Sequence, residues 1–370
     1  MSATGRDASS PRGAPRVVCV GIVASRVDTS WPTRALSQAP SVQGGQPTQG
    51  AHLPLGGQRA AQGGEHTSGN ARGAALITAM FVAALAAAVV AALAASQSQW
   101  LRSVELRRDQ VQAQALVLAG LAWARQVIHE DARAGRYDHL GEPWSLPLPP
   151  TPLENGSIEG RIIDAQGLLN VNNLAAGGSA ARVEQARLAR LFAQAGLPAG
   201  SLDALADWID ADDVARDGGG ETAAYADTRP ARVPPNAPLL RTAEASLARG
   251  VDATRFASLA PYVIALPSTT TLNVNTAPAE VLAAAVNGLQ GDALAALVAD
   301  RGRKLFTTTA EFRARLPSGA SVEELSTLDV RSDYFLVTVK SRQGETIAQG
   351  RALLRREGDA LPRVVWQTIE

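Results

Sequence analysis

The sequence predicts an α+β fold in which a long N-terminal helix packs on a small antiparallel sheet and a large all-helical block is inserted into that sheet. Three observations lead to this prediction. A helical pattern begins with an almost purely apolar run at Ala74 and continues to about Gly135. One alternating strand pattern, Ser157–Asp164, comes before the helical block, and three more strand patterns follow the block near the C-terminus.

The apolar run from Ala74 to about Ala95 is the predicted membrane anchor. It contains one polar side chain, Thr78, and no charged one. About 22 apolar residues are enough for a helix to cross the hydrocarbon of a bilayer. Beyond the run, apolar side chains recur at heptad-like spacing and form a stripe that we expect to pack on a partner surface. This stripe consists of Val104, Val111, Ala115, Leu118 and Ala122.

The rest of the chain alternates between sheet and helical patterns. Prolines between Pro143 and Pro152 mark an extended connector. The final strand patterns are Tyr334–Lys340, Thr346–Arg355 and Arg363–Ile369. We therefore expect a leader of largely disordered composition (residues 1–73), the membrane-spanning and N-terminal helix (74–135), a connector with the first strand (136–168), a helical insertion (169–328, in two parts of about 169–270 and 271–328) and the C-terminal strands (329–370).

Composition and charge exclude some classes of function. Residues 1–73 hold seven of the 35 basic residues and three of the 35 acidic ones, so the remainder carries 28 basic and 32 acidic residues. A mildly acidic chain has no electrostatic reason to bind nucleic acid. The single cysteine, Cys19, lies in the leader, so the remainder cannot form a disulfide within itself. No arrangement of Ser, His and acid residues indicates catalysis, and we expect no enzyme.

The junction Arg72-Gly73-Ala74 places a basic residue and a glycine directly before the apolar run. A secretory signal has the opposite order, with its apolar core before the cleavage site. The junction resembles the prepilin-type signal, which is cleaved after the glycine and leaves the helix on the mature protein. We therefore expect prepilin peptidase to cleave between Gly73 and Ala74. The leader is long for such a signal, and either a genuine long leader or a true start further downstream fits the sequence.

Three motifs carry a second resemblance. The first is Ile162–Leu174 (IIDAQGLLNVNNL), and the third is Leu272–Leu282 (LNVNTAPAEVL). The second combines Asp207–Asp213 (DWIDADD) with Gly220-Glu221, Tyr225 and Pro235-Asn236. In this order, behind a prepilin-type signal, the motifs closely resemble the minor pseudopilins of the type II secretion system protein K family.

The resemblance implies a pilin-like fold with a SAM-like or helix-hairpin-like insertion. It implies a tip complex with the minor pseudopilins I, J and H, which initiates the pseudopilus and supports export of folded proteins across the outer membrane. Further implied partners are the major pseudopilin, prepilin peptidase, the inner-membrane assembly platform and membrane lipid. It also implies a methylated mature N-terminus and a single-pass anchor in the bacterial inner membrane, with the globular part in the periplasm.

Thr78 occupies mature position five, where most pilins and pseudopilins carry glutamate. The protein K family characteristically lacks this glutamate. In other subunits the carboxylate pairs with the N-terminal amine of a neighbouring subunit inside the membrane. A subunit without it cannot make that contact with a subunit above, so we expect this chain at the tip of the fibre.

An acidic cluster is the candidate metal site. Asp207 and Asp210 are three residues apart, so on a helix they share a face. A glycine-rich loop separates this pair from Glu221. The spacing alone fits either a site for a hard cation such as Ca²⁺ or a solvated acidic helix end. The resemblance implies a structural Ca²⁺ in this helical part. The candidate ligands are Asp207, Asp210, Asp212, Asp213, Glu221 and Asn236.

The segment from Asn273 to Asp300 has a rival interpretation. It resembles the helix-hairpin-helix modules of nucleic-acid-binding proteins, in which Asn273 or Thr276 would cap the first helix. The turn Gly288–Gly291 has glutamine in place of the second glycine, and no Lys or Arg occurs between Ala277 and Asp300. We therefore expect a scaffold and no nucleic-acid partner. A membrane-anchored nucleic-acid-binding protein and a tip component of a related type IV pilus are the alternative functions.

Overall fold

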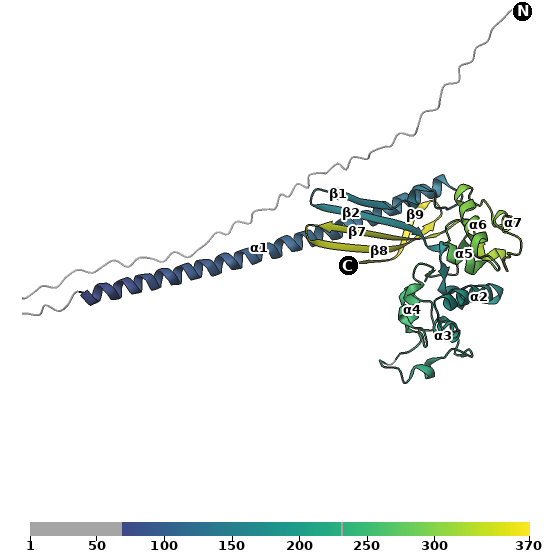
Figure 1. Cartoon of the computed structure of the whole chain (residues 1–370), viewed down its shortest axis with the longest axis horizontal. Helices are drawn as coiled ribbons and strands as arrows, with labels where there is room; N and C mark the ends of the chain where they lie inside the picture. Colours follow the sequence, from purple (N-terminus) through teal and green to yellow (C-terminus); the bar gives the residue numbers. More distant parts are fainter. Residues whose placement is uncertain (1–68, 231) are drawn as a thin grey trace, which may run out of the picture. The chain divides into compact units, whose positions relative to one another are not determined.

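The long N-terminal helix α1 extends from Gly69 to Ala134, so it ends one residue before the predicted Gly135 (Figure 1). The computed structural model describes residues 69–230 and 232–370, and the predicted disorder of residues 1–70 lies almost wholly outside this part of the chain. Among the described residues, α1 is the one helix that is long and apolar enough to cross a membrane. Residues Gly73–Glu370 form one compact unit.

The sheet has five antiparallel strands in the order β1-β2-β7-β8-β9 (Figure 1). Their bounds are Leu148–Leu153 (β1), Gly156–Asp164 (β2), Tyr334–Gln343 (β7), Thr346–Glu357 (β8) and Ala360–Ile369 (β9). Four of these were predicted. Strand β1 was not, because its three prolines indicated an extended connector; prolines are tolerated on an edge strand, which is the position that β1 occupies.

Helix α1 packs on the sheet through a face that differs from the predicted stripe. Val117, Leu121 and Ile128 are buried against Phe335 and other apolar side chains of β7 and β8. The predicted stripe is exposed, with 65% of Val111 and 46% of Leu118 accessible to solvent. The sheet packs on the face of α1 where small residues, including Gly120 and Ala124, allow close approach of the strands.

Gly350 on β8 makes one of the closest contacts between sheet and helix. A Cβ atom on Gly350 would lie 2.2 Å from Cγ1 of Val117, a stiff side chain on α1. We expect Gly350→Ala to lower the free energy of unfolding by about 1–3 kcal/mol, because overpacking forces the helix and sheet apart. Denaturant unfolding measures this change. Gly302→Ala is the control, since nothing lies within 4 Å of that position; an equal loss there would contradict the prediction.

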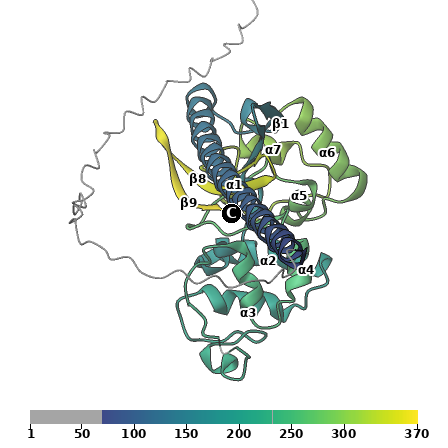
Figure 2. The same cartoon turned by 90° about the vertical axis from the view of Figure 1, so that its left-hand side faces the viewer.

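The insertion between β2 and β7 contains two groups of helices (Figures 1 and 2). The first group consists of α2 (Gly178–Gln194), α3 (Gly200–Ile209) and α4 (Ala253–Ser258), and the second of α5 (Ala279–Ala285), α6 (Gly291–Arg303) and α7 (Thr309–Ala314). Short 3₁₀ turns connect the elements of the chain: η1 (Pro143–Ser145), η2 (Ala165–Gly167), η3 (Val171–Ala175), η4 (Thr222–Tyr225), η5 (Thr242–Leu247) and η6 (Leu325–Thr327).

The sequence had predicted a purely helical insertion, but the insertion is not purely helical. It also contains two short parallel pairs, β3 (Leu169–Asn170) with β4 (Val263–Ile264) and β5 (Leu272–Asn273) with β6 (Leu328–Asp329). Strands of two residues are too short to produce an alternating pattern in the sequence. Each pair joins the start of one half of the insertion to its end.

Both halves begin with the sequence Leu-Asn-Val-Asn, and the asparagines have equivalent contacts. Asn172 exchanges hydrogen bonds with the backbone of Leu239, and Asn275 does the same with Phe306. The predicted capping role of Asn273 or Thr276 is wrong, because Pro278 precedes α5 without a side-chain cap. Both side chains instead contact Asp164 at the end of β2.

Candidate functional site

The acidic cluster lies where helix α3 ends and a glycine-rich loop begins. Apolar packing fixes this end of the helix: Trp208 and Ile209 are buried, and the Trp208 ring lies 5.1 Å from the ring of Tyr225. Asp207 is fully buried, and Asp210 directly follows Ile209, the last residue of α3. Both carboxylates contact one cation, the guanidinium of Arg216, at the same terminal nitrogen.

Asp207 is already satisfied by protein donors. Its Oδ2 atom accepts hydrogen bonds from the backbone N–H groups of Gly220 at 2.8 Å and Arg216 at 3.0 Å. Its Oδ1 atom accepts from the Arg216 side chain, which also donates to Oδ2 of Asp210 at 2.6 Å. The loop can approach this closely because Gly219 has no side chain; a Cβ there would lie 2.0 Å from Asp207 Oδ2.

Four other oxygen atoms in the cluster are buried without a hydrogen-bond partner among the described residues. They are Oδ1 of Asp210, both carboxylate oxygens of Glu221 and Oδ1 of Asn236. The amide nitrogen of Asn236 donates at 3.3 Å to the backbone oxygen of Asp212 and to Oδ1 of Asp213. Asn236 also has a positive φ of 44°, a conformation that asparagine tolerates better than most residues.

The electrostatics of these oxygens favour a bound cation. Burial raises the pKa of Glu221, and the charges of Asp207, Asp210 and the following aspartates raise it further. Burial also raises the pKa of Asp210, partly offset by Arg216. Buried oxygens without partners are costly unless a proton or a metal ion satisfies them. Oxygen atoms of Asp210, Asp212 and Glu221 lie within 4.8 Å of one another, so the residues present fit a hard cation with oxygen ligands.

The structure thus brings together Asp210, Asp212, Glu221 and Asn236, with Asp213 in contact with Asn236. Asp207 lies beside them, with its oxygens occupied by Arg216 and the loop backbone. Sequence reasoning missed Arg216. A cation in an irregular loop carries no spacing signal, because its contacts depend on how the loop turns back.

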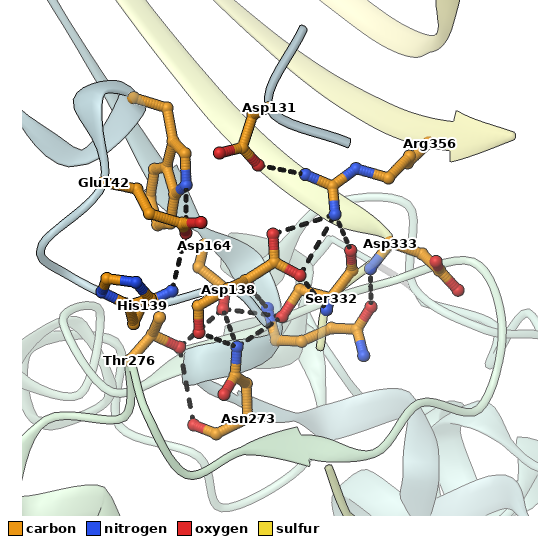
Figure 3. Close-up of polar contacts among 12 residues, drawn as sticks. Asp131, Asp138, His139, Glu142, Asp164, Asn273, Thr276, Ser332, Asp333 and Arg356 are labelled. Carbon is orange, nitrogen blue, oxygen red and sulfur yellow. Dashed lines mark hydrogen bonds and ion pairs between the residues drawn. The ribbon is translucent and has the colours of Figure 1, made fainter. Parts of the chain in front are cut away.

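A second polar cluster, also missed, joins the end of α1, the connector after it, the sheet and the insertion (Figure 3). Arg356 on β8 is its centre. One terminal nitrogen of Arg356 donates to Oδ2 of Asp131 on α1 at 2.7 Å, and the other donates to both carboxylate oxygens of Asp138 at 2.9 and 3.1 Å. The pairs are separated by more than 200 residues in the sequence, so no local pattern could indicate them. We call Asp131, Asp138, Glu142, Asp164 and Arg356 the junction cluster.

Asp164 connects the sheet to the second half of the insertion (Figure 3). Its Oδ2 atom accepts hydrogen bonds from Asn273 at 2.9 Å, Thr276 at 2.5 Å and Ser332 at 2.7 Å. Burial raises the pKa of Asp164 to about 6, although the hydrogen bonds from Thr276 and Ser332 act in the opposite direction. Asp164 and Asn273 belong to the first and third sequence motifs, so those motifs include the residues that join sheet and insertion.

The residues of the predicted signal lie at the start of α1. Gly73 and Ala74 are within the helix, and Thr78 is exposed. The Thr78 hydroxyl donates back to the carbonyl oxygens of Ala74 and Ala75, both at 2.9 Å. Thr78 therefore satisfies its polar group within its own helix and presents no charge to a neighbouring chain.

Comparison with known proteins connects these features. Residues 167–268 and 272–331 match two consecutive family models, both described as "Type II secretion system (T2SS), protein K". Type II secretion system protein K of Pseudomonas aeruginosa is 32% identical over 305 residues, which cover 79% of this chain and 91% of the relative. The protein of the same name from Pectobacterium carotovorum is 28% identical over 306 residues, covering 78% of this chain and 93% of the relative.

A solved structure supports the same relationship. The chain is similar to a chain in the crystal structure of the GspK-GspI-GspJ complex from the type 2 secretion system of enterotoxigenic Escherichia coli, with a TM-score of 0.64 and 25% identity. The similarity covers 72% of this chain and 99% of the other. The α+β fold predicted from the sequence is confirmed. The chain belongs to the type II secretion system protein K family, and it is a minor pseudopilin of the pseudopilus tip complex.

Proposed function

We propose that this subunit occupies the tip of the pseudopilus, where it initiates assembly and supports export of folded proteins across the outer membrane. Thr78 is the observation that carries this proposal. Its side chain bonds only to its own helix turn among the described residues, and it offers no carboxylate to the amine of a subunit above. The insertion adds bulk beside the sheet, which also disfavours stacking of a further subunit.

The proposed partners are the minor pseudopilins I, J and H and the major pseudopilin. The solved relative is a complex with GspI and GspJ, as its description states. The stripe of Val104, Val111 and Leu118 on α1 is exposed in this chain and is available for packing against the helices of neighbouring subunits. Prepilin peptidase and the inner-membrane assembly platform would act on the same helix, which lipid would surround before assembly.

We also propose an orientation for the chain. Helix α1 anchors it once in the inner membrane, and the sheet and insertion lie in the periplasm. The role is structural, without catalysis and without a nucleic-acid partner. The hairpin of α5 and α6 contains no basic residue before Arg301, so the charge needed for phosphate contacts is missing there.

Ca²⁺ is the proposed cofactor of the acidic cluster. Asp210, Asp212, Glu221 and Asn236 would hold it, with Asp213 orienting Asn236 and Asp207 fixing the loop through Arg216. The ion would supply a crosslink between α3 and the loops at Glu221 and Asn236. The only cysteine of the chain is Cys19, so no disulfide can make such a crosslink here.

Processing at the junction tests the pseudopilin proposal directly. We expect the membrane-bound form to begin at Ala74, with a methylated amine, because the peptidase cleaves after Gly73. Mass spectrometry of the intact membrane form measures this. Any other processed N-terminus contradicts the proposal.

Deletion of the gene separates secretion from a related pilus. We expect folded exoproteins to accumulate in the periplasm while type IV pilus-dependent motility is unchanged, with secretion restored by the intact gene. Lost motility with normal secretion would instead favour the pilus. Salt-sensitive gel shifts of DNA by the purified chain would favour the nucleic-acid alternative.

A further inference from the structure

The junction cluster holds more acidic groups than its single cation can neutralise. Asp138, Glu142, Asp164 and Arg356 are each less than one-tenth exposed, and the side chain of Asp131 is 10% exposed. Four carboxylates around one guanidinium would leave an excess of three negative charges if all were ionised. Because buried charge without compensation is costly, part of this cluster must be neutralised by protons or by a bound cation.

Asp131 and Glu142 are the carboxylates best placed to hold one proton between them. Oε2 of Glu142 accepts from the backbone N–H of His139 at 2.8 Å and from the indole of Trp144 at 2.9 Å. Carboxylate oxygens of Glu142, Asp131 and Asp138 lie within 4.8 Å of one another. Two buried carboxylates this close repel each other when both are ionised, so one proton shared between Asp131 and Glu142 relieves the repulsion.

Other charged groups around the pair have their own partners. From α1, the exposed Glu130 accepts from Gln126, which lies one turn earlier on the same helix. From the connector, the His139 ring accepts from the N–H of Gly141 at 3.0 Å. From the insertion, Asp329 accepts from the N–H of Val330 at 2.7 Å. Asp138 and Arg356 are paired with each other, and Asp164 is held by Asn273, Thr276 and Ser332. The pair of Asp131 and Glu142 is therefore where a proton can leave with least loss of other bonds.

We propose that Asp131 and Glu142 form a proton-operated clasp between the end of the long helix and the connector that follows it. With the shared proton, the connector is held closed on Arg356. Loss of the proton places two like charges side by side and loosens the connector together with the chain around Ser332. Asp138 transmits the change, because it accepts from the N–H of Ser332 at 2.7 Å and donates its own N–H to the carbonyl oxygen of Val330 at 3.0 Å.

The direction of the pH effect follows from the same burial. Burial raises the pKa of Asp131 to about 7, with further contributions from Glu142 and Asp138, against the opposing effect of Arg356. Burial also raises the pKa of Glu142. Groups of this kind bind protons more tightly in the folded state. Their contribution to stability is complete below the ordinary carboxyl pKa of about 4 and is lost as the pH rises through about 7.

Hydrogen exchange of the full chain in detergent micelles tests the clasp. We expect protection of residues 136–145 and 330–334 to fall roughly tenfold between pH 6 and pH 8, after correction for the intrinsic exchange rate. Protection within β7 and β8 should not change. Equal protection of the junction at both pH values would overturn the proposal.

Neutral variants identify the titrating groups. Asp131→Asn removes the titration and keeps an oxygen for Arg356, so its junction should be equally protected at pH 6 and pH 8. Glu142→Gln provides the same test if Asp131→Asn does not fold. Glu130→Gln, which removes the neighbouring exposed charge, should keep the parent's pH dependence. A pH dependence that persists in both neutral variants, or that an excess of chelator abolishes, would overturn the assignment.

Discussion

Replacing Arg356 by methionine is expected to lower the free energy of unfolding by about 3–5 kcal/mol, the largest single-residue effect that we expect in this protein. Removal of one partner from a buried ion pair leaves the other charge buried and uncompensated. Here the loss affects both Asp131 and Asp138, which receive hydrogen bonds from the two terminal nitrogens of Arg356. The guanidinium also lies 4.7 Å from the ring centre of Phe335, and this contact is lost as well.

Denaturant unfolding of the full chain in detergent measures the effect at pH 8, which is above the pKa of about 7 of Asp131. Arg363→Met is the matched control. Arg363 also pairs with a carboxylate, that of Glu357 at 2.8 Å, but both side chains are about half exposed. An exposed pair contributes about 0–1 kcal/mol. Similar losses for the two variants would contradict the central role of Arg356.

Removal of calcium is expected to give the second largest effect. An ion present at a concentration of one hundred times its dissociation constant stabilises the folded state by about 2.7 kcal/mol. Excess chelator should therefore lower the melting temperature of the full chain by roughly 5–10 °C. The reason is that Glu221 and Asn236 retain buried oxygens without partners among the described residues when no ion is bound.

Two aspartates of the same loop make a matched pair for this experiment. Asp210→Asn should melt at a lower temperature than the parent in calcium and should respond little to chelator. Asp217→Asn changes an exposed aspartate outside the cluster and should respond like the parent. A parent melting temperature that is unchanged by chelator would refute the calcium proposal, whatever the variants do.

Elements with strong local patterns were predictable from the sequence. The long helix and strands β2, β7, β8 and β9 follow from apolar runs and alternation, and their observed bounds lie within a few residues of the predicted ones. Strand β1 has prolines in place of alternation, so only its pairing with β2 reveals it. The packing face of α1 was also unpredictable, because several faces of the helix are apolar and the small residues select one of them.

The acidic cluster and the junction cluster also differ in how far the sequence could predict them. The acidic ligands around Asp210 are close in sequence, so their types and spacing indicated a site before the structure did. Arg216 and the junction cluster depend on tertiary contacts. Asp131 meets Arg356 only after α1 packs on the sheet, and Asp164 meets Asn273 only after the insertion folds back. Spacing in the sequence carries no information on such contacts.

The pairing of β2 with β7 has a consequence for the architecture as a whole. Asp164 and Phe335, where the insertion leaves and rejoins the sheet, are directly opposite each other in an antiparallel ladder. In topological terms, residues 165–334 are the loop of a β-hairpin. A short turn would be enough to connect the same two strand ends. Because the entropy of closing a loop grows only slowly with its length, a longer loop at this point adds little to the cost of closing the hairpin. The hairpin of β2 and β7 is thus an insertion site, at which a domain can be enlarged, shortened or exchanged while the sheet and α1 stay the same.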